Sequence, residues 1–495
     1  MTTSNDSLPA PPRALGVPAL AGLRAALAPL GLVALAVSVG VSLRLVGAEG
    51  ELWLDEVTTL RLVSRATALS DVFLKIHSDN NHTLNSAWIF LIGPDQSAPL
   101  LRLPAIVFGG LSLLAARRAA GRYGQAAGLI AALLFATSYF FVHYGSEARG
   151  YSAMILASLL AFDALQAWLD RSERGALLVF AAAVCFGTFS HLTMVEATGA
   201  LCLSAAARIL AEDGKLSAQL KRAAIPCVAA AIGSAPALAC FAYGFAAGDY
   251  RMGWLAPFSF ETLAQGLAGL SRTTLGLPEA LGDGAVVALT AALALVLLKL
   301  APSRARWFPA IAIFGLPLLH AALGFPTQLY PRFHLIDAVG LLLLASVGLG
   351  VLWERRGASR LLAVAALTLF GLGQAWNLTE FFRNGRGQYT AAIMRIASEG
   401  GSYAVPEDSA PFETAKVADV AARRAGVKAD FVAEKDLCAE KPQWLVVTAL
   451  VNLPRDFPSE RTAGPPGCEA RFVRDRSFPA WGLSGFSWTL YRRAP

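Results

Sequence analysis

Residues 124–169 read GQAAGLIAALLFATSYFFVHYGSEARGYSAMILASLLAFDALQAWL, which is two apolar runs joined by one short polar loop. A helix needs about 20 mostly apolar residues to cross a bilayer, and the runs 124–143 and 150–169 both reach about that length. The polar loop between them is too short to extend far from a membrane surface. The stretch therefore predicts a transmembrane helical hairpin with charged side chains at its turn.

The same alternation continues over most of the chain. The 495 residues are 55% hydrophobic and only 16% charged, whereas a soluble protein carries about a quarter charged residues. Beyond the hairpin, apolar runs predict nine more spans, the first of them a retained helix behind a polar, Pro- and Ala-rich N-terminus: 25–45, 98–116, 175–190, 192–210, 223–246, 283–300, 307–324, 334–353 and 360–378. The predicted fold is a membrane all-α bundle of about eleven transmembrane helices.

Lys and Arg residues predict how the bundle is oriented. They cluster in every second loop, for example Arg117, Arg118 and Arg122 in one loop and Arg355 and Arg356 in another. Cytoplasmic loops carry such clusters, so the N-terminus is expected in the cytoplasm and, after an odd number of spans, the C-terminus outside it. The formal net charge of +7 is explained by these loops, and no nucleic-acid-binding motif accompanies it.

The composition changes near residue 380. Residues 1–380 form the predicted membrane domain, and residues 381–495 read as a small extracytoplasmic α/β domain, with helices expected at 388–397 and 410–425. Strands are expected at 444–448, 470–473 and 488–491. Cys438 and Cys468 would share an oxidising compartment, so a disulfide between them is expected, with two free thiols as the alternative. The cysteines and histidines show no zinc spacing, so no metal site is predicted.

Polar residues at the outer ends of the spans are the candidates for chemistry, because ionisable groups at a membrane domain usually mark function. Asp55 and Glu56 follow the first span, and a carboxylate there can act as a general base. The alternative is an acidic helix start in a solvated loop. His82 lies in the polar stretch HSDNNHT (77–83), which could bind a metal or a polar substrate or be an exposed loop.

Two further segments carry arginines at the same side of the membrane. Glu147, Arg149 and Tyr151 lie at the turn of the quoted hairpin. Tyr330 and Arg332 precede the span at 334–353. Either arginine could bind a phosphate through its planar guanidinium. The alternatives are helix capping by a Glu147–Arg149 pair and an interfacial anchor at Tyr330 and Arg332.

These residues carry a resemblance to a known family. The acidic pair after the first span, the string RLPAIVFGGLSLLAARRAAGRYG (102–124), SYFFVHYGSEARGYS (138–152) and YPRF (330–333) resemble the GT-C glycosyltransferases. The similarity is to the bacterial relatives of protein O-mannosyltransferases and of the lipid A aminoarabinose transferase. It is best over residues 50–165, fainter to 335 and weak in the C-terminal part.

The resemblance implies inverting transfer of a sugar from a polyprenyl-phosphate donor to an extracytoplasmic glycan, lipid or protein. By this resemblance Asp55 is the general base with Glu56 beside it, and Arg149 and Arg332 hold the donor phosphate. Glu147 positions them or the sugar, and Tyr151 and Tyr330 belong to the same substrate-binding set. His82 matches a family His that two prolines follow, whereas Thr83 and Leu84 follow it here.

The resemblance leaves the cofactor open, because some GT-C enzymes use a divalent cation and others do not. It implies a multi-pass protein of the bacterial inner membrane with a periplasmic C-terminal domain.

Two other functions compete with glycosyl transfer. A lipid or lipid-linked glycan transporter would use ionisable residues within the bilayer, of which Asp163 is one. A non-catalytic membrane scaffold would leave the rim residues without a chemical role.

Overall fold

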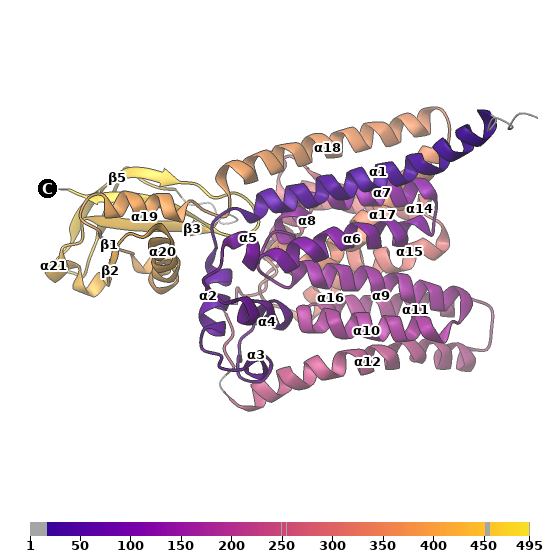
Figure 1. Ribbon diagram of the computed structural model, residues 1–495, viewed down its shortest axis with the longest axis horizontal. Helices are drawn as coiled ribbons and strands as arrows, with labels where there is room; N and C mark the ends of the chain where they lie inside the picture. The colour runs from indigo at the N-terminus through magenta and orange to yellow at the C-terminus, as the bar shows by residue number, and fades with distance from the viewer. Residues whose placement is uncertain (1–16, 249, 254, 451–455, 495) are drawn as a thin grey trace, which may run out of the picture.

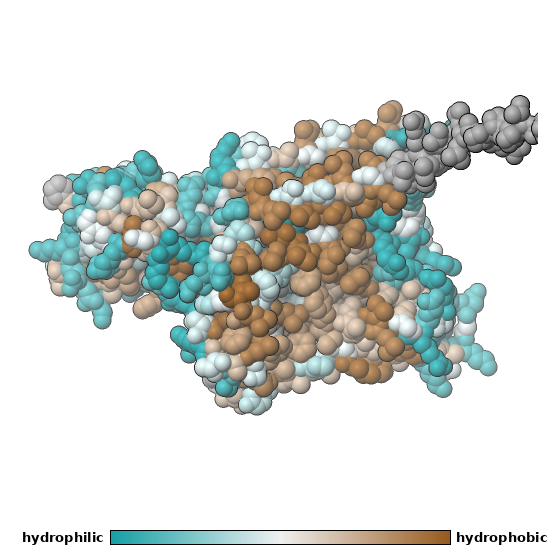
Figure 2. All heavy atoms as spheres, in the orientation of Figure 1, coloured by the Kyte–Doolittle hydropathy of each residue, from teal (hydrophilic) through white to brown (hydrophobic). Residues whose placement is uncertain are grey.

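The computed structural model describes residues 17–248, 250–253, 255–450 and 456–494, with side chains from residue 30 onward. A helical bundle is followed by a sheet-containing C-terminal domain that lies against one end of the bundle (Figure 1). Apolar side chains cover the flank of the bundle, and polar ones gather on the C-terminal domain and at the opposite end of the helices (Figure 2). A belt of exposed apolar side chains on a helical bundle is what a lipid-embedded protein shows.

Eight helical segments in the described part of the chain are long and apolar enough to cross a membrane. They are α1 (Val17–Ala48), α6 (Leu103–Gly121), α9 (Tyr151–Arg171), α12 (Leu216–Ala246), α14 (Asp283–Leu300), the run from α15 (Ser303–Ala310) through η1 (Ile311–Gly315) to α16 (Leu316–Leu323), α17 (Leu335–Glu354) with the turn η2 (Pro331–His334) before it, and α18 (Ala358–Asn384). The other three predicted spans coincide with shorter helices. These are α7 (Gln125–Thr137), which α8 (Tyr139–Tyr144) follows, α10 (Arg174–Ser190) and α11 (Met194–Leu210).

Ion pairs hold the end of the bundle that lies away from the C-terminal domain. Asp163 in the second half of α9 accepts from Arg118 at 2.6 Å and from Arg122 at 2.5 Å, and Arg208 pairs with Asp170 at 2.6 Å. The carboxylate of Asp163 is therefore neutralised by two guanidiniums that close α9 onto α6 and the turn after it.

At the other end, the loop after the first span folds into four short helices. These are α2 (Leu54–Val63), α3 (Leu69–Leu74), α4 (Thr83–Ile92) and α5 (Ala98–Leu101). The helix α13 (Phe260–Leu275) also lies at this end, and it starts where the Ser259 side chain accepts from Thr262 N. Together with the hairpin turn at 145–150, these elements form the end of the bundle that faces the C-terminal domain.

The C-terminal domain contains one mixed six-stranded sheet in the order β2-β1-β3-β6-β5-β4. The strands are β1 (Ser402–Ala404), β2 (Asp430–Val432), β3 (Trp444–Leu450), β4 (Glu460–Ala463), β5 (Ala470–Phe478) and β6 (Phe486–Arg493). Strands β1, β2 and β3 run parallel, and the pairs β3–β6, β6–β5 and β5–β4 are antiparallel. The helices α19 (Tyr389–Ala397) and α20 (Pro411–Ala425) pack against one face through a core that includes Trp444 and Trp488.

Side chains from the first loop fix the C-terminal domain on the bundle. Trp53, only 3% exposed, belongs to the core under α19 and α20, and Leu54 packs against it. Arg61 on α2 pairs with Asp419 on α20 at 2.9 Å. Trp53 is thus buried in the C-terminal domain, whereas Asp55 and Glu56, which follow it closely in the sequence, are surrounded by helices of the bundle.

Candidate active site

The two adjacent acids have different surroundings. Trp53 anchors the start of α2 in the C-terminal domain, and Glu56 points back into the bundle. Asp55 between them has a side chain that is 20% exposed, whereas Glu56 is 1% exposed. Successive residues at a helix start point in different directions, so only Asp55 is left where a substrate can reach a carboxylate.

Glu56 forms a buried ion pair with Arg102, which sequence reasoning did not single out. Arg102 Nε and Nη2 donate to the two carboxylate oxygens at 2.8 and 2.6 Å, and Arg102 is fully buried. Ala148 N donates to Glu56 Oε1 at 2.7 Å, which ties α2 to the hairpin turn. Burial alone would raise the pKa of Glu56, but the charge and hydrogen bonds of Arg102 outweigh it and lower that pKa. Glu56 is therefore a charged structural residue, and both of its carboxylate oxygens accept hydrogen bonds from the protein.

Arg149 and Arg332 converge on Asp55 from two separate segments. Arg149 Nη2 lies 3.4 Å and Arg332 Nη1 3.9 Å from Asp55 Oδ2. The two guanidiniums belong to the hairpin turn and to η2, so residues far apart in the sequence share one carboxylate. An array of two arginines around one anionic group is also the charge pattern that a phosphate would need.

Aromatic rings surround Arg332. Its guanidinium carbon lies 4.6 Å from the Tyr330 ring, 5.5 Å from the Phe333 ring and 5.7 Å from the Trp53 ring. Tyr151 lies in the same way beside Arg149, at 5.8 Å. Cation–π contacts of this kind favour a charge that is out of water, so Tyr330 and Tyr151 hold the two guanidiniums in place.

Asn80 connects Asp55 to Arg149, and its part was not foreseen. Asn80 Nδ2 donates to Asp55 O at 2.8 Å and to Thr59 Oγ1 at 2.9 Å, while Asn80 Oδ1 accepts from Arg149 Nη1. The stretch 77–83 is therefore not an exposed loop at this position. The amide spans the gap between the candidate base and the candidate phosphate ligand.

His82 positions the backbone next to Arg149. Its Nδ1 accepts from Gly150 N at 2.7 Å, and its ring lies 5.3 Å from the Tyr151 ring and 4.4 Å from the His191 ring. Burial first, and then the positive charge of Arg149, hold the pKa of His82 well below its usual range. A neutral ring is also what the bond requires, since a protonated Nδ1 cannot accept.

Glu147, predicted to bind substrate, lies in a buried network that reaches into the C-terminal domain. Its Oε1 accepts from Arg386 Nε at 3.1 Å and from the Ser484 hydroxyl, and His143 Nε2 lies 3.1 Å away. Arg386 also donates to Gly47 O and His143 O. Burial alone would raise the pKa of Glu147, but the bond to His143 and the charge of Arg386 lower it. The hairpin turn is thus bonded to both domains.

We expect Ser484→Ala to lower the free energy of unfolding by about 1.5–3 kcal/mol, the range for a hydrogen bond to a charged group. The hydroxyl donates to the carboxylate of Glu147, which is fully buried. Denaturant unfolding of the purified protein measures the change. Ser398→Ala removes an exposed hydroxyl that, among the described residues, bonds Arg395 O. This change should alter stability by less than about 0.5 kcal/mol. Equal effects of the two substitutions would remove Ser484 from the network.

Several buried polar atoms around the site have no hydrogen-bond partner among the described residues. They include the donors Trp53 Nε1, Tyr144 Oη and Arg149 Nε, and the acceptor Glu147 Oε2. Leaving such atoms unpaired costs free energy unless something occupies them. Two of these donors, Trp53 Nε1 and Arg149 Nε, belong to side chains that lie next to Arg332 and Asp55. Unused donors at this place are what a site that accepts a substrate would show.

In the C-terminal domain, Cys438 and Cys468 form a disulfide with their Cα atoms 6.0 Å apart. It closes the short helix α21 (Leu437–Glu440) onto the turn between β4 and β5. In the described part of the chain, no group of three or more His, Cys, Asp or Glu side chains is arranged to hold a metal ion.

Comparisons with known proteins give structural neighbours. No protein-family model matches the chain, and neither does any curated protein. Two solved structures that are similar to the chain are an ArnT and an oligosaccharyltransferase. ArnT from Cupriavidus metallidurans bound to undecaprenyl phosphate is 12% identical, with 93% of this chain and 98% of that chain covered and a TM-score of 0.49. The archaeal oligosaccharyltransferase AglB from Archaeoglobus fulgidus, in complex with an inhibitory peptide and a dolichol-phosphate, is 11% identical over 86% and 70%, with a TM-score of 0.44.

Proposed function

We propose that the protein is an inverting membrane glycosyltransferase that moves a sugar from a polyprenyl-phosphate donor to an extracytoplasmic glycan, lipid or protein. The observation that carries the proposal is the contact of Asp55 with both Arg149 and Arg332 at one end of the helical bundle. The resemblance of the sequence around these three residues to GT-C enzymes points the same way. A donor with a lipid tail in the bilayer and a phosphate at its surface fits a site at the end of the helices.

In the proposed reaction, the acceptor hydroxyl attacks the anomeric carbon of the sugar while Asp55 takes its proton. The bond from that carbon to the phosphate oxygen breaks, and polyprenyl phosphate leaves with the electron pair. Arg149 and Arg332 stabilise the charge that develops on the leaving phosphate. A single displacement of this kind inverts the configuration of the sugar.

The remaining predicted residues act on this core in the proposal. Tyr151 and Tyr330 hold the two arginines. Glu56, paired with Arg102, fixes the segment that carries Asp55. Glu147 fixes the hairpin turn that carries Arg149. His82 supports the backbone at Gly150. A divalent cation would have few protein ligands beside Asp55 in the described residues, and no step of the proposed reaction is assigned to one.

The proposed membrane arrangement has eleven crossings in the bacterial inner membrane, with the N-terminus in the cytoplasm and the C-terminal domain in the periplasm. The loops rich in Lys and Arg support this orientation. The disulfide supports an oxidising compartment for the C-terminal domain. The three short helices α7, α10 and α11 make up the count in this arrangement.

The competing functions lose the features that favoured them. Asp163, the residue expected of a transporter, is paired with Arg118 and Arg122. A scaffold would have no need for a carboxylate that stays partly exposed between two guanidiniums and lies next to unpaired buried donors.

The test is a transfer assay on purified protein in detergent or liposomes. A panel of radiolabelled decaprenyl-phosphate hexoses and pentoses is offered with a membrane glycolipid extract as acceptor, and release of decaprenyl phosphate is followed. The proposal requires that at least one donor is consumed by the wild type and spared by Asp55→Asn. Donor consumption that is the same in both proteins would refute it.

The pH dependence of stability follows from His82. Its pKa is depressed in the folded protein, so folded and unfolded states are both neutral well above pH 6.5 and the residue has no effect there. Below the unfolded pKa near 6.5, the unfolded chain takes up a proton that the folded one refuses, and stability falls by about 1.4 kcal/mol per pH unit for this residue. Burial lowers the pKa of His191 as well, so His191 adds to the loss in the same pH range. Unfolding measured between pH 8 and pH 5 should show both losses, and His82→Gln should make the fall shallower by the share of His82. A slope that His82→Gln leaves unchanged would assign the effect elsewhere.

A further inference from the structure

A pocket opens beside the candidate active site, between the first loop and the helices α10 and α12. It has a volume of about 80 Å³. One wall is shared with the site, because His82, which supports Gly150, and His191, whose ring lies 4.8 Å from that of Tyr151, both line the pocket. The pocket is therefore adjacent to the hairpin turn that carries Arg149.

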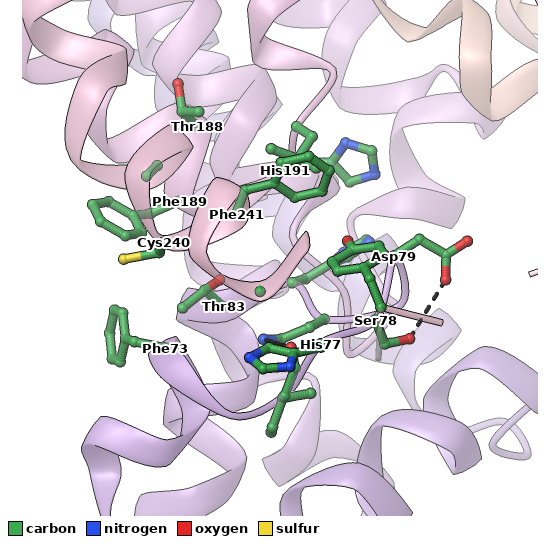
Figure 3. Close-up of a pocket in the computed structure, with 17 residues that line it drawn as sticks. Phe73, His77, Ser78, Asp79, Thr83, Thr188, Phe189, His191, Cys240 and Phe241 are labelled. Atoms are coloured by element: carbon green, nitrogen blue, oxygen red, sulfur yellow. Dashed lines mark hydrogen bonds between the residues drawn. The ribbon is translucent and has the colours of Figure 1, made fainter. Parts of the chain in front are cut away.

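The two sides of the pocket differ in chemistry. Figure 3 shows Phe73 and Phe189 on one side and Ser78 and Asp79 on the other, with Phe241 between them near His191. No Lys or Arg is among the described residues that line it, and Asp79 is its one carboxylate. An anionic group of a ligand would therefore bind Arg149 and Arg332 and not the pocket. The pocket suits an uncharged group that has both an apolar and a polar face.

One acceptor in the lining is fixed and unused. Asn81 Nδ2 donates to Val72 O at 2.8 Å and to Ile76 O at 3.2 Å, which sets the orientation of the amide. Asn81 Oδ1 is buried and has no hydrogen-bond partner among the described residues. A buried acceptor without a partner calls for a ligand donor such as a hydroxyl.

We propose that this pocket holds the glycosyl ring of the polyprenyl-linked donor. The proposal rests on the proposed function. A sugar ring has C–H faces that pack on aromatic rings and hydroxyls on its edge that reach Asn81, Ser78 and Asp79. Its phosphate then lies at Arg149 and Arg332, on the pocket side of Asp55. In this proposal the pocket takes the one sugar ring that is bonded to the phosphate.

Cys240 makes the proposal testable without turnover. Cys240 lines the pocket, whereas Cys227, on the same helix α12, does not. Wild-type protein without acceptor is treated with a methanethiosulfonate reagent, and both thiols are followed by peptide mass spectrometry. The ligands are a decaprenyl-phosphate sugar that the transfer assay has identified, or in its absence each member of the panel, and sugar-free decaprenyl phosphate.

At ten times its dissociation constant, the sugar-bearing donor should slow modification of Cys240 about tenfold, because about one site in eleven remains empty. Sugar-free decaprenyl phosphate should leave Cys240 reactive, and Cys227 should react equally in all samples. Equal protection by both lipids would make the pocket a site for the lipid chain, and no protection by any donor would leave it outside the donor site. Either result overturns the proposal. Because this readout needs no transfer, its failure is distinct from a failure to consume donor.

A matched pair of variants gives a second readout. Phe241→Ala should raise the KM of the sugar-bearing donor by about threefold to tenfold, the range for loss of one aromatic contact, and leave inhibition by sugar-free decaprenyl phosphate unchanged. Phe241→Tyr keeps the ring and should restore the KM. If Phe241→Ala weakens both lipids to the same degree, the ring contacts the lipid and the proposal is wrong.

Discussion

Asp55→Asn is expected to lower the rate of sugar transfer by about 10²–10⁴-fold, the range for a positioned general base. The amide keeps the shape of the side chain but cannot take the proton of an acceptor hydroxyl. Asp55 is also the anionic partner of Arg149 and Arg332 at 3.4 and 3.9 Å. Without its charge, both guanidiniums are free for a phosphate, so binding of sugar-free decaprenyl phosphate should become tighter while turnover is lost. Single-turnover kinetics with competition by the product lipid measures both changes.

The control for this substitution is Asp419→Asn, which removes an exposed carboxylate that pairs with Arg61 across the domain boundary. Its effect on turnover should be small, because exposed pairs contribute about 1 kcal/mol or less. Asp55→Asn with normal turnover would exclude Asp55 as the base. Lost turnover together with weakened product binding would instead mean that the substitution disturbs the phosphate site.

Sequence patterns predicted the helical part well because a lipid environment demands long apolar runs. All eleven predicted segments contain helix, including α9 and α17, whose apolar runs are almost wholly buried. The lengths were less predictable, since α7 ends at Thr137 and the chain restarts as α8 before the hairpin turn. In the C-terminal domain the strands β1, β2 and β4 were missed. Each has only three or four residues, which is too short for an alternating pattern to be visible.

The site was predictable where charge stood out from its surroundings. Arg149 and Arg332 are isolated cations at the ends of spans, and the structure brings both to Asp55. Arg386 was not predictable, because nothing in the local sequence separates it from Arg383, which is exposed and pairs with Glu380. Ser484, in the same way, acquires its role only when the C-terminal domain docks on the bundle.

Arg102 is an instructive omission, since it is the one charge in the apolar run 98–116 and lay within the string that carried the family resemblance. We expect Arg102→Met to destabilise the protein by about 3–5 kcal/mol, the effect of leaving a buried charge without its partner. Glu56 would keep only the backbone donors Trp53 N and Ala148 N. Denaturant unfolding in detergent measures the loss, which should exceed that of Arg118→Met, a change in a largely exposed side chain.

The double variant Arg102→Met/Glu56→Leu separates the two roles that Glu56 could have. If Glu56 has only a structural role, removing its charge together with that of Arg102 leaves no buried ion. The double variant should then be more stable than Arg102→Met alone. If Glu56 instead took part in catalysis beside Asp55, Glu56→Gln would abolish transfer in a protein of normal stability. The four hydrogen bonds from Arg102, Trp53 and Ala148 to the Glu56 carboxylate favour the first outcome. They occupy the oxygens that a base must keep free for its substrate.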